Sequence, residues 1–77
     1  MREIDRASRT PPWRQIAADL RQEIDAGTYG PDDPLPSIER LVQTYDVNRK
    51  TARKALTSLV DAGLVEVEPG MGHYVRR

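Results

Sequence analysis

The chain has 77 residues, with 12 basic and 12 acidic side chains, one histidine and no cysteine. A domain of this size buries only about 60% of its unfolded surface, which favours a small three-helix core over a deep catalytic cavity. The lack of cysteine excludes disulfides and thiolate metal sites, and no apolar run reaches the roughly 20 residues of a membrane helix. No signal peptide opens the sequence, so we expect one cytoplasmic domain that does not bind a membrane.

The start of the chain combines three arginines with acids and a single strong apolar residue, Ile4. We expect a loose N-terminal arm or a short frayed helix over residues 1–10 and one domain over residues 11–77. Thr10 is expected to cap a first helix that begins at the two prolines that follow it in the sequence, and Gly27 is expected to end that helix. Its apolar residues follow helical spacing: Trp13, Ile16, Ala17, Leu20 and Ile24.

Residues 28–36 are rich in proline and turn residues and predict a connection, with a very short extended piece at Leu35. Ser37 is expected to cap a second, short helix. The apolar stripe of that helix is Ile38, Leu41, Val42 and Tyr45. A turn at residues 46–47 then leads into a third helix, and this order is the helix-turn-helix layout.

The third helix is predicted over residues 48–62, with Asn48 as its N-cap. One side is apolar, through Ala52, Ala55, Leu56, Leu59 and Val60. The opposite, N-terminal side is expected to carry four cations and no acid: Arg49, Lys50, Arg53 and Lys54. Like charges one turn apart repel each other, so helix stability does not explain the four cations. A polyanion bound along that side would explain them. This pattern predicts a recognition helix for the DNA major groove; the alternative is a solvated basic helix.

The end of the sequence predicts a β-hairpin over residues 64–76, with its turn at residues 69–72. A hairpin that directly follows a recognition helix is the wing of a winged helix. The glycines at its tip offer backbone amides that can approach phosphates or the minor groove closely. The expected fold is mainly α (α+β), a winged helix-turn-helix of three helices followed by a two-stranded hairpin.

Taken in order, these motifs resemble the DNA-binding domain of GntR-family bacterial transcription regulators, over about residues 12–75. The motifs that carry the resemblance are Trp13-Arg14-Gln15-Ile16-Ala17, Leu35-Pro36-Ser37, Val47-Asn48-Arg49, Gly63-Leu64-Val65 and Gly70-Met71-Gly72-His73-Tyr74-Val75. The resemblance implies a transcription regulator, usually a repressor, that binds a double-stranded DNA operator. It also implies an inverted-repeat operator and a homodimer.

By resemblance, Arg49 and Arg53 are the base readers, because arginine binds guanine O6 and N7 as a bidentate donor. The other candidates add base or phosphate contacts from the helix starts and the wing. The full set of candidate DNA-binding residues is Ser37, Arg40, Asn48, Arg49, Lys50, Thr51, Arg53, Lys54, Gly70, Met71, Gly72 and His73. No cofactor or metal is implied.

Several positions depart from the usual family pattern. Glu39 stands where an arginine often touches DNA, and Arg40, one residue along, is expected to substitute from a different angle. Asp46 and Asp32 replace glycines, and Trp13 replaces a tyrosine. Family members normally have a second domain that binds a metabolite and dimerises, whereas we expect no effector domain and no small-molecule effector site in this chain.

Other classes of function fit the sequence less well. An enzyme is not expected, because His73 is the only histidine and has no paired nucleophile. RNA-binding modules stack bases on exposed aromatic residues, which are missing here. The remaining alternative is a winged helix that binds protein, for which an exposed apolar patch on the third helix would be expected.

Overall fold

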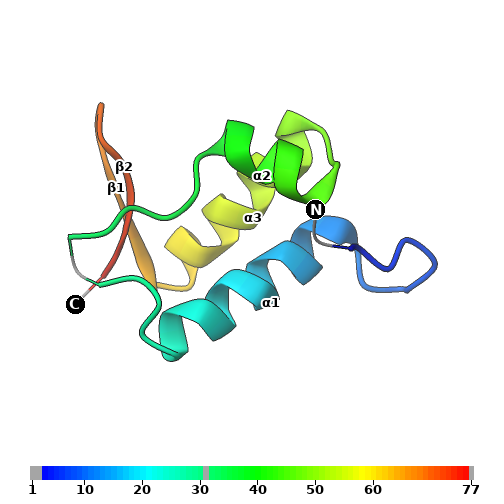
Figure 1. Ribbon diagram of the computed structural model, residues 1–77, viewed down its shortest axis with the longest axis horizontal. Helices are drawn as coiled ribbons and strands as arrows, with labels where there is room; N and C mark the ends of the chain where they lie inside the picture. The colour runs from blue at the N-terminus through cyan, green and yellow to red at the C-terminus, as the bar shows by residue number, and fades with distance from the viewer. Residues whose placement is uncertain (1–2, 31, 77) are drawn as a thin grey trace.

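The computed structural model describes residues 3–30 and 32–76, so the outermost residues of the predicted arm and domain lie outside it. The helices and strands in chain order are α1 (Pro12–Asp25), α2 (Ile38–Tyr45), α3 (Arg49–Asp61), β1 (Val65–Glu68) and β2 (Gly72–Val75) (Figure 1). Three helices followed by a two-stranded antiparallel sheet confirm the predicted winged helix-turn-helix. Over the described residues, no helix has the length and apolar character needed to cross a membrane.

The start of α1 differs from the prediction. Its N-cap is Pro11, which makes no side-chain capping bond, so the expectation that Thr10 caps this helix is wrong. Proline fixes the backbone angle that a helix start requires, and Pro12 at the first helical position needs no donor. The carbonyl of Thr10 instead accepts a 2.8 Å hydrogen bond from Gln15 Nε2, which makes Thr10 part of the arm.

The two caps around the helix-turn-helix turn are confirmed. Ser37 Oγ accepts a hydrogen bond from the amide of Arg40 at 3.2 Å, and Asn48 Oδ1 accepts one from the amide of Thr51 at 2.8 Å. Between them, Asp46 ends α2 in the left-handed conformation with φ 54°. Aspartate tolerates this conformation better than most residues, which explains how it can stand in place of a glycine.

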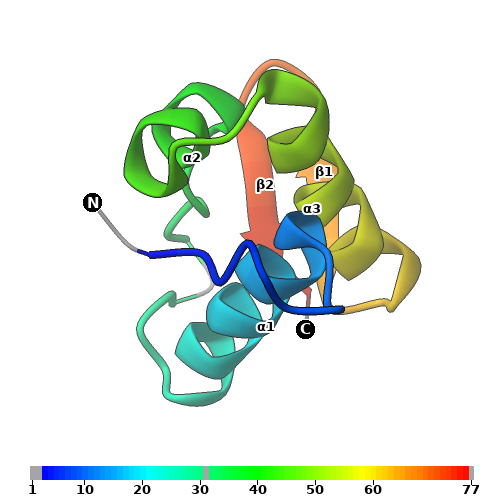
Figure 2. The same ribbon diagram turned by 90° about the vertical axis from the view of Figure 1, so that its right-hand side faces the viewer.

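The core lies between the three helices and is closed by the hairpin. Figure 2 shows the helices as a triangle, with α3 on the right and its outer side turned away from α1 and α2. Two alanines of α3, Ala52 and Ala55, are fully buried, and their small side chains let the neighbouring helices approach closely. The buried residues are Ile16, Leu20, Leu35, Leu41, Tyr45, Ala52, Ala55, Leu56, Leu59 and Val65.

The hairpin is antiparallel and pairs Val65 with Val75 at its base and Glu68 with Gly72 at its tip. The amide of Met71 donates to the carbonyl of Glu68 at 2.9 Å, and Gly70 has φ 79°. Proline followed by a residue with positive φ is typical of a type II turn, which explains the glycine at this position.

The connection between α1 and α2 joins the edge of this sheet. The amide of Leu35 donates to the carbonyl of His73 at 2.8 Å, and Pro34 bridges to Tyr74. The short extended piece predicted at Leu35 is therefore confirmed. It fixes the hairpin next to the N-terminus of α2.

Candidate nucleic-acid interface

The outer side of α3 is basic, as its sequence pattern predicts. All four cations of the helix are exposed, while the apolar stripe on the other side is buried apart from the half-buried Val60. Acidic residues are absent from α3 until its last residue, Asp61. The assignment of the two faces is therefore confirmed.

The four cations share one side of α3, and the two at the edges of that side also contact neighbouring helices. Arg49 Nη1 lies 2.6 Å from Glu39 Oε1 of α2, and Lys54 Nζ lies 4.9 Å from the ring centroid of Trp13 in α1. Residues five positions apart are separated by roughly 140° around a helix. Arg49 and Lys54 therefore stand at opposite edges of the exposed arc, where each meets a neighbouring helix.

Arg53 and Lys50 lie between those edges. Neither side chain makes an ion pair or a hydrogen bond to any part of the chain in residues 3–30 and 32–76. A cation without an internal partner keeps its full hydration and is available to an external anion. The middle of the exposed arc is thus the part of α3 that is free to bind.

The pair between Arg49 and Glu39 is exposed, with 58% and 63% of the two side chains accessible to solvent. The hydrogen bond from the Arg49 guanidinium holds the pKa of Glu39 below its usual value, so this carboxylate is ionised at neutral pH. Exposed ion pairs contribute little to stability and are screened by salt. Arg49 can therefore exchange Glu39 for another anion at low cost.

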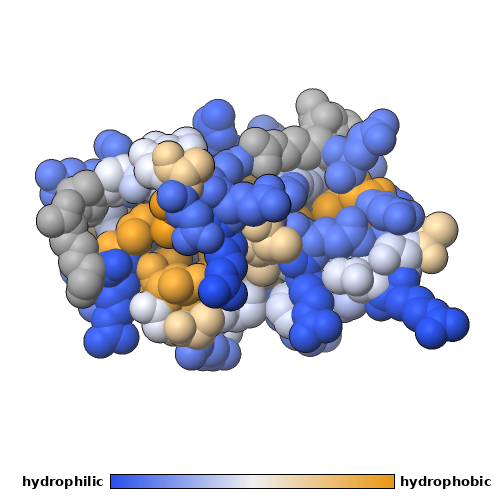
Figure 3. All heavy atoms as spheres, turned by 90° about the horizontal axis from the view of Figure 1, so that it is seen from below, coloured by the Kyte–Doolittle hydropathy of each residue, from blue (hydrophilic) through white to orange (hydrophobic). Residues whose placement is uncertain are grey.

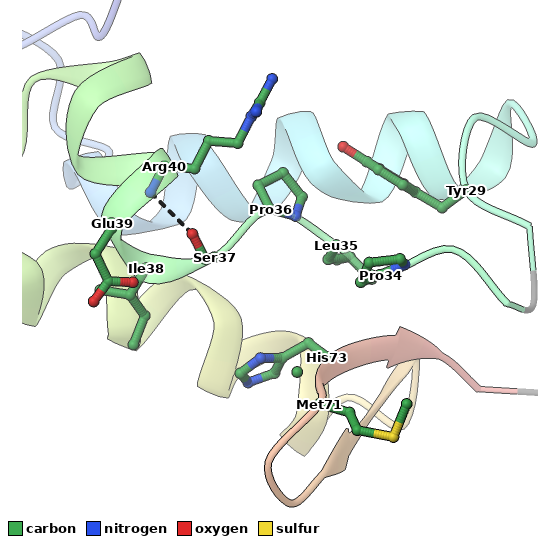
Figure 4. Close-up of a pocket in the computed structure, with 11 residues that line it drawn as sticks. Tyr29, Pro34, Leu35, Pro36, Ser37, Ile38, Glu39, Arg40, Met71 and His73 are labelled. Carbon is green, nitrogen blue, oxygen red and sulfur yellow. Dashed lines mark hydrogen bonds between the residues drawn. The ribbon is translucent and has the colours of Figure 1, made fainter.

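A groove runs between the N-terminus of α2 and the hairpin. Five of the candidate residues line it: Ser37, Arg40, Met71, Gly72 and His73. Figure 4 shows that Glu39 and Arg40 leave α2 on opposite sides, with Glu39 toward α3 and the Arg40 guanidinium away from the hairpin. Arg40 also lines a second pocket, together with Tyr29 and Thr44. The Arg40 guanidinium therefore leaves α2 at a different angle from Glu39, and its substitution for an arginine at position 39 stays a prediction.

The tip of the hairpin is open to solvent. Met71 is 70% exposed, an unusual degree for a large apolar side chain, and the adjacent Gly72 has φ 124°. His73 is half-buried, and burial lowers its pKa, so its imidazole is neutral at pH 7. The hairpin therefore offers backbone amides and an apolar side chain, rather than a fixed positive charge.

The face of the molecule on the α1 side has a different character. Figure 3 views it from below Figure 1 and shows mostly hydrophilic side chains around an apolar area near the hairpin end. The exposed charges of α1 have both signs, with Arg14 and Arg21 offset by Asp25. A shallow groove on this side is mostly apolar, with Trp13, Ala17, Ala18, Leu59, Ala62 and Leu64 in its lining. The described residues contain no group of three or more histidine or acidic side chains placed to hold a metal ion.

Comparison with known families and proteins gives a consistent result. A model of the bacterial regulatory proteins of the gntR family matches residues 12–75. The HTH-type transcriptional repressor NagR of Bacillus subtilis is 35% identical over 74 residues, which are 96% of this chain and 30% of NagR. The chain spans less than a third of the length of three curated relatives that it matches.

Solved structures show the same architecture. YtrA from Sulfolobus acidocaldarius, a GntR-family transcription factor, superposes with a TM-score of 0.86 at 38% identity, covering 96% of this chain and 78% of YtrA. The DNA-binding domain of AraR in complex with operator ORE1 superposes with a TM-score of 0.82 at 30% identity, covering 94% of this chain and 88% of that domain. The likeness extends over nearly all of the chain, including the hairpin.

Proposed function

This chain belongs to the GntR family of bacterial regulatory proteins, and we propose on that basis that it binds a specific double-stranded DNA operator and regulates transcription. We infer that it represses, since NagR is named a repressor, and that it acts in the cytoplasm, where a bacterial operator lies. The observation that carries the proposal is the outer side of the N-terminal half of α3, which has no acid and on which Arg53 and Lys50 are exposed without a hydrogen bond or ion pair to the described residues.

In the proposed complex, α3 enters the major groove with Arg53 toward the bases. Its guanidinium can donate two parallel hydrogen bonds to one guanine, which gives sequence preference. Lys50 lies next to it and Lys54 at the edge of the exposed arc, and both attract phosphates, which adds affinity without sequence preference. Arg49 leaves Glu39 and takes a base or a phosphate in its place.

The hairpin and the start of α2 add contacts to the DNA backbone. Ser37 Oγ accepts the capping bond from Arg40, but its hydroxyl still has a proton to donate to a phosphate. Gly70 and Gly72 have no side chain that would hold the backbone of the hairpin away from the sugar-phosphate chain. We propose that DNA in the adjacent groove covers the exposed side chain of Met71.

One winged helix reads only one half-site. We propose that two copies of the chain bind an inverted repeat as a homodimer, because the symmetry of an operator follows that of the protein. Two linked half-sites also raise the overall affinity well above that of one domain.

Selection from a pool of random duplexes tests the function. We expect one motif to be enriched, and we expect affinity for it to fall steeply as salt rises, because each phosphate contact releases counterions. A protein-binding winged helix is the alternative, and its apolar interface would respond weakly to salt. Failure to enrich any motif at low ionic strength would contradict the proposal.

Glu39→Gln is expected to strengthen binding to random duplex DNA by about fivefold at low salt. The substitution removes one negative charge beside the proposed DNA surface, an interaction of about 1 kcal/mol at contact distance in water, and it releases Arg49. Asp25→Asn is the matched control, since it removes the same charge from the exposed end of α1. Fluorescence anisotropy with a labelled random duplex measures the affinity of both variants. Equal affinities of the two variants would place Glu39 away from DNA.

A further inference from the structure

The N-terminal arm is fixed to the domain, although its sequence predicted a loose segment. The amide of Asp5 donates to Gln15 Oε1 at 2.9 Å, and Gln15 Nε2 donates to the carbonyls of Asp5 and Thr10, each at 2.8 Å. Ile4 packs against the core. Figure 2 shows the arm crossing the N-terminal end of α1. One side chain of α1 therefore closes the arm into a defined loop.

From this loop, Arg6 reaches the turn between α2 and α3. Its Nη2 donates to the carbonyl of Asp46 at 2.6 Å and to the carbonyl of Tyr45 at 3.2 Å. Carbonyls at the end of a helix lack intrahelical donors and lie at the negative end of the helix dipole. A guanidinium satisfies them well, because it combines positive charge with several donors.

The turn that Arg6 contacts sets the position of α3. Asp46 holds the left-handed conformation, and Asn48, two residues later, caps α3 through Thr51. A displacement of this turn would move the N-terminal end of α3, and Arg49 and Arg53 would move with it. The contact of Arg6 therefore links three segments: the arm on α1, the end of α2 and the start of α3.

We propose that Arg6 is a positioning residue for DNA recognition, which braces the α2–α3 turn and thereby fixes the orientation of α3. This inference rests on the proposed function, because the orientation of α3 matters for binding only if α3 reads DNA. Arg6 acts here through backbone carbonyls of its own chain. Both of these hydrogen bonds use Nη2, so a phosphate contact through Nη1 or Nε is the alternative that an experiment has to separate from this role.

Arg9 supplies a matched control in the same arm. It is exposed, and within the described part of the chain it makes no hydrogen bond or ion pair. Arg6→Ala and Arg9→Ala remove the same charge from the same segment. Only the first of them removes the brace.

The test compares Arg6→Ala, Arg6→Lys and Arg9→Ala for binding to the selected duplex and to random duplex, at several salt concentrations. We expect Arg6→Ala to weaken selected-duplex binding by roughly two- to thirtyfold, the range for residues that act on a ligand from a distance. Its affinity for random duplex and its salt dependence should match those of Arg9→Ala. Arg6→Lys should recover part of the loss, because an ammonium can still donate to both carbonyls, and it keeps the test valid if the alanine variant unfolds.

Two results would overturn the proposal that Arg6 positions α3. Equal losses on both duplexes, with a salt slope smaller by about one, would make Arg6 a phosphate ligand. Equal affinity of Arg6→Ala and Arg9→Ala for the selected duplex would show that Arg6 has no role in DNA recognition. Amide NMR spectra of the free protein test the contact of Arg6 with the turn independently of DNA binding. Arg6→Ala should shift the resonances of Val47 to Arg49 in the absence of DNA, and Arg9→Ala should leave them unchanged. A failure of the positioning role can therefore be told apart from a failure of the proposed function.

Discussion

Arg53→Ala is expected to reduce affinity for the selected duplex by about 1–3 kcal/mol, the discrimination that one bidentate arginine–guanine contact provides. Affinity for random duplex should fall much less, so the variant loses sequence preference more than it loses binding. The melting temperature should stay near that of the parent, because the side chain is exposed and makes no internal hydrogen bond or ion pair in the described part of the chain. Anisotropy titrations with the two duplexes and thermal unfolding by circular dichroism measure these effects.

Arg21→Ala is the control for this result. Arg21 is an exposed arginine on α1, beside the apolar groove and away from the outer side of α3. Its removal changes the net charge by the same amount as the removal of Arg53. If Arg21→Ala lost as much preference as Arg53→Ala, or if Arg53→Ala unfolded the domain, the assignment of the binding face would be wrong.

Leu56→Ala should have the opposite effect, with a large loss of stability and no direct effect on the binding surface. Leu56 is 1% exposed and lies in the core beneath the cationic side of α3. Truncation of a buried leucine costs about 2–5 kcal/mol, through lost transfer free energy and the cavity that remains. Small domains are stable by only about 5–15 kcal/mol, so a substantial part of the total would be lost.

Urea denaturation, followed by the fluorescence of Trp13, measures the loss. Thr57→Ala is the control, because Thr57 is the next residue of the same helix and is exposed. Substitution of an exposed residue usually changes stability by less than about 0.5 kcal/mol. An unchanged midpoint for Leu56→Ala would mean that the core does not depend on this residue.

The features that could be predicted from the sequence depend on local rules. The caps at Ser37 and Asn48 follow from a side-chain oxygen that reaches an amide three residues further along. The buried stripe of α3 follows from helical spacing. At the start of α1 two such rules compete, and proline geometry prevails over the hydroxyl of Thr10.

The contacts that the sequence missed join segments that are distant in the chain. Lys54 lies over Trp13, 41 positions earlier, and Arg6 binds carbonyls 39 and 40 positions later. Helical periodicity shows which side of α3 is exposed, but the identity of the neighbours at its edges depends on how the helices pack. Glu39 stood out in the sequence as an unusual acid, whereas its role as the partner of Arg49 requires the position of α2 beside α3.

A map of amide chemical shifts during titration with the selected duplex tests the central claim, that DNA covers the outer side of α3 and the hairpin tip. We expect the largest changes over residues 49–57, at the start of α2 and at residues 69–73, with Arg21 and its neighbours on α1 unaffected. Largest changes along the groove of Trp13 and Leu64, with α3 unchanged, would contradict the claim.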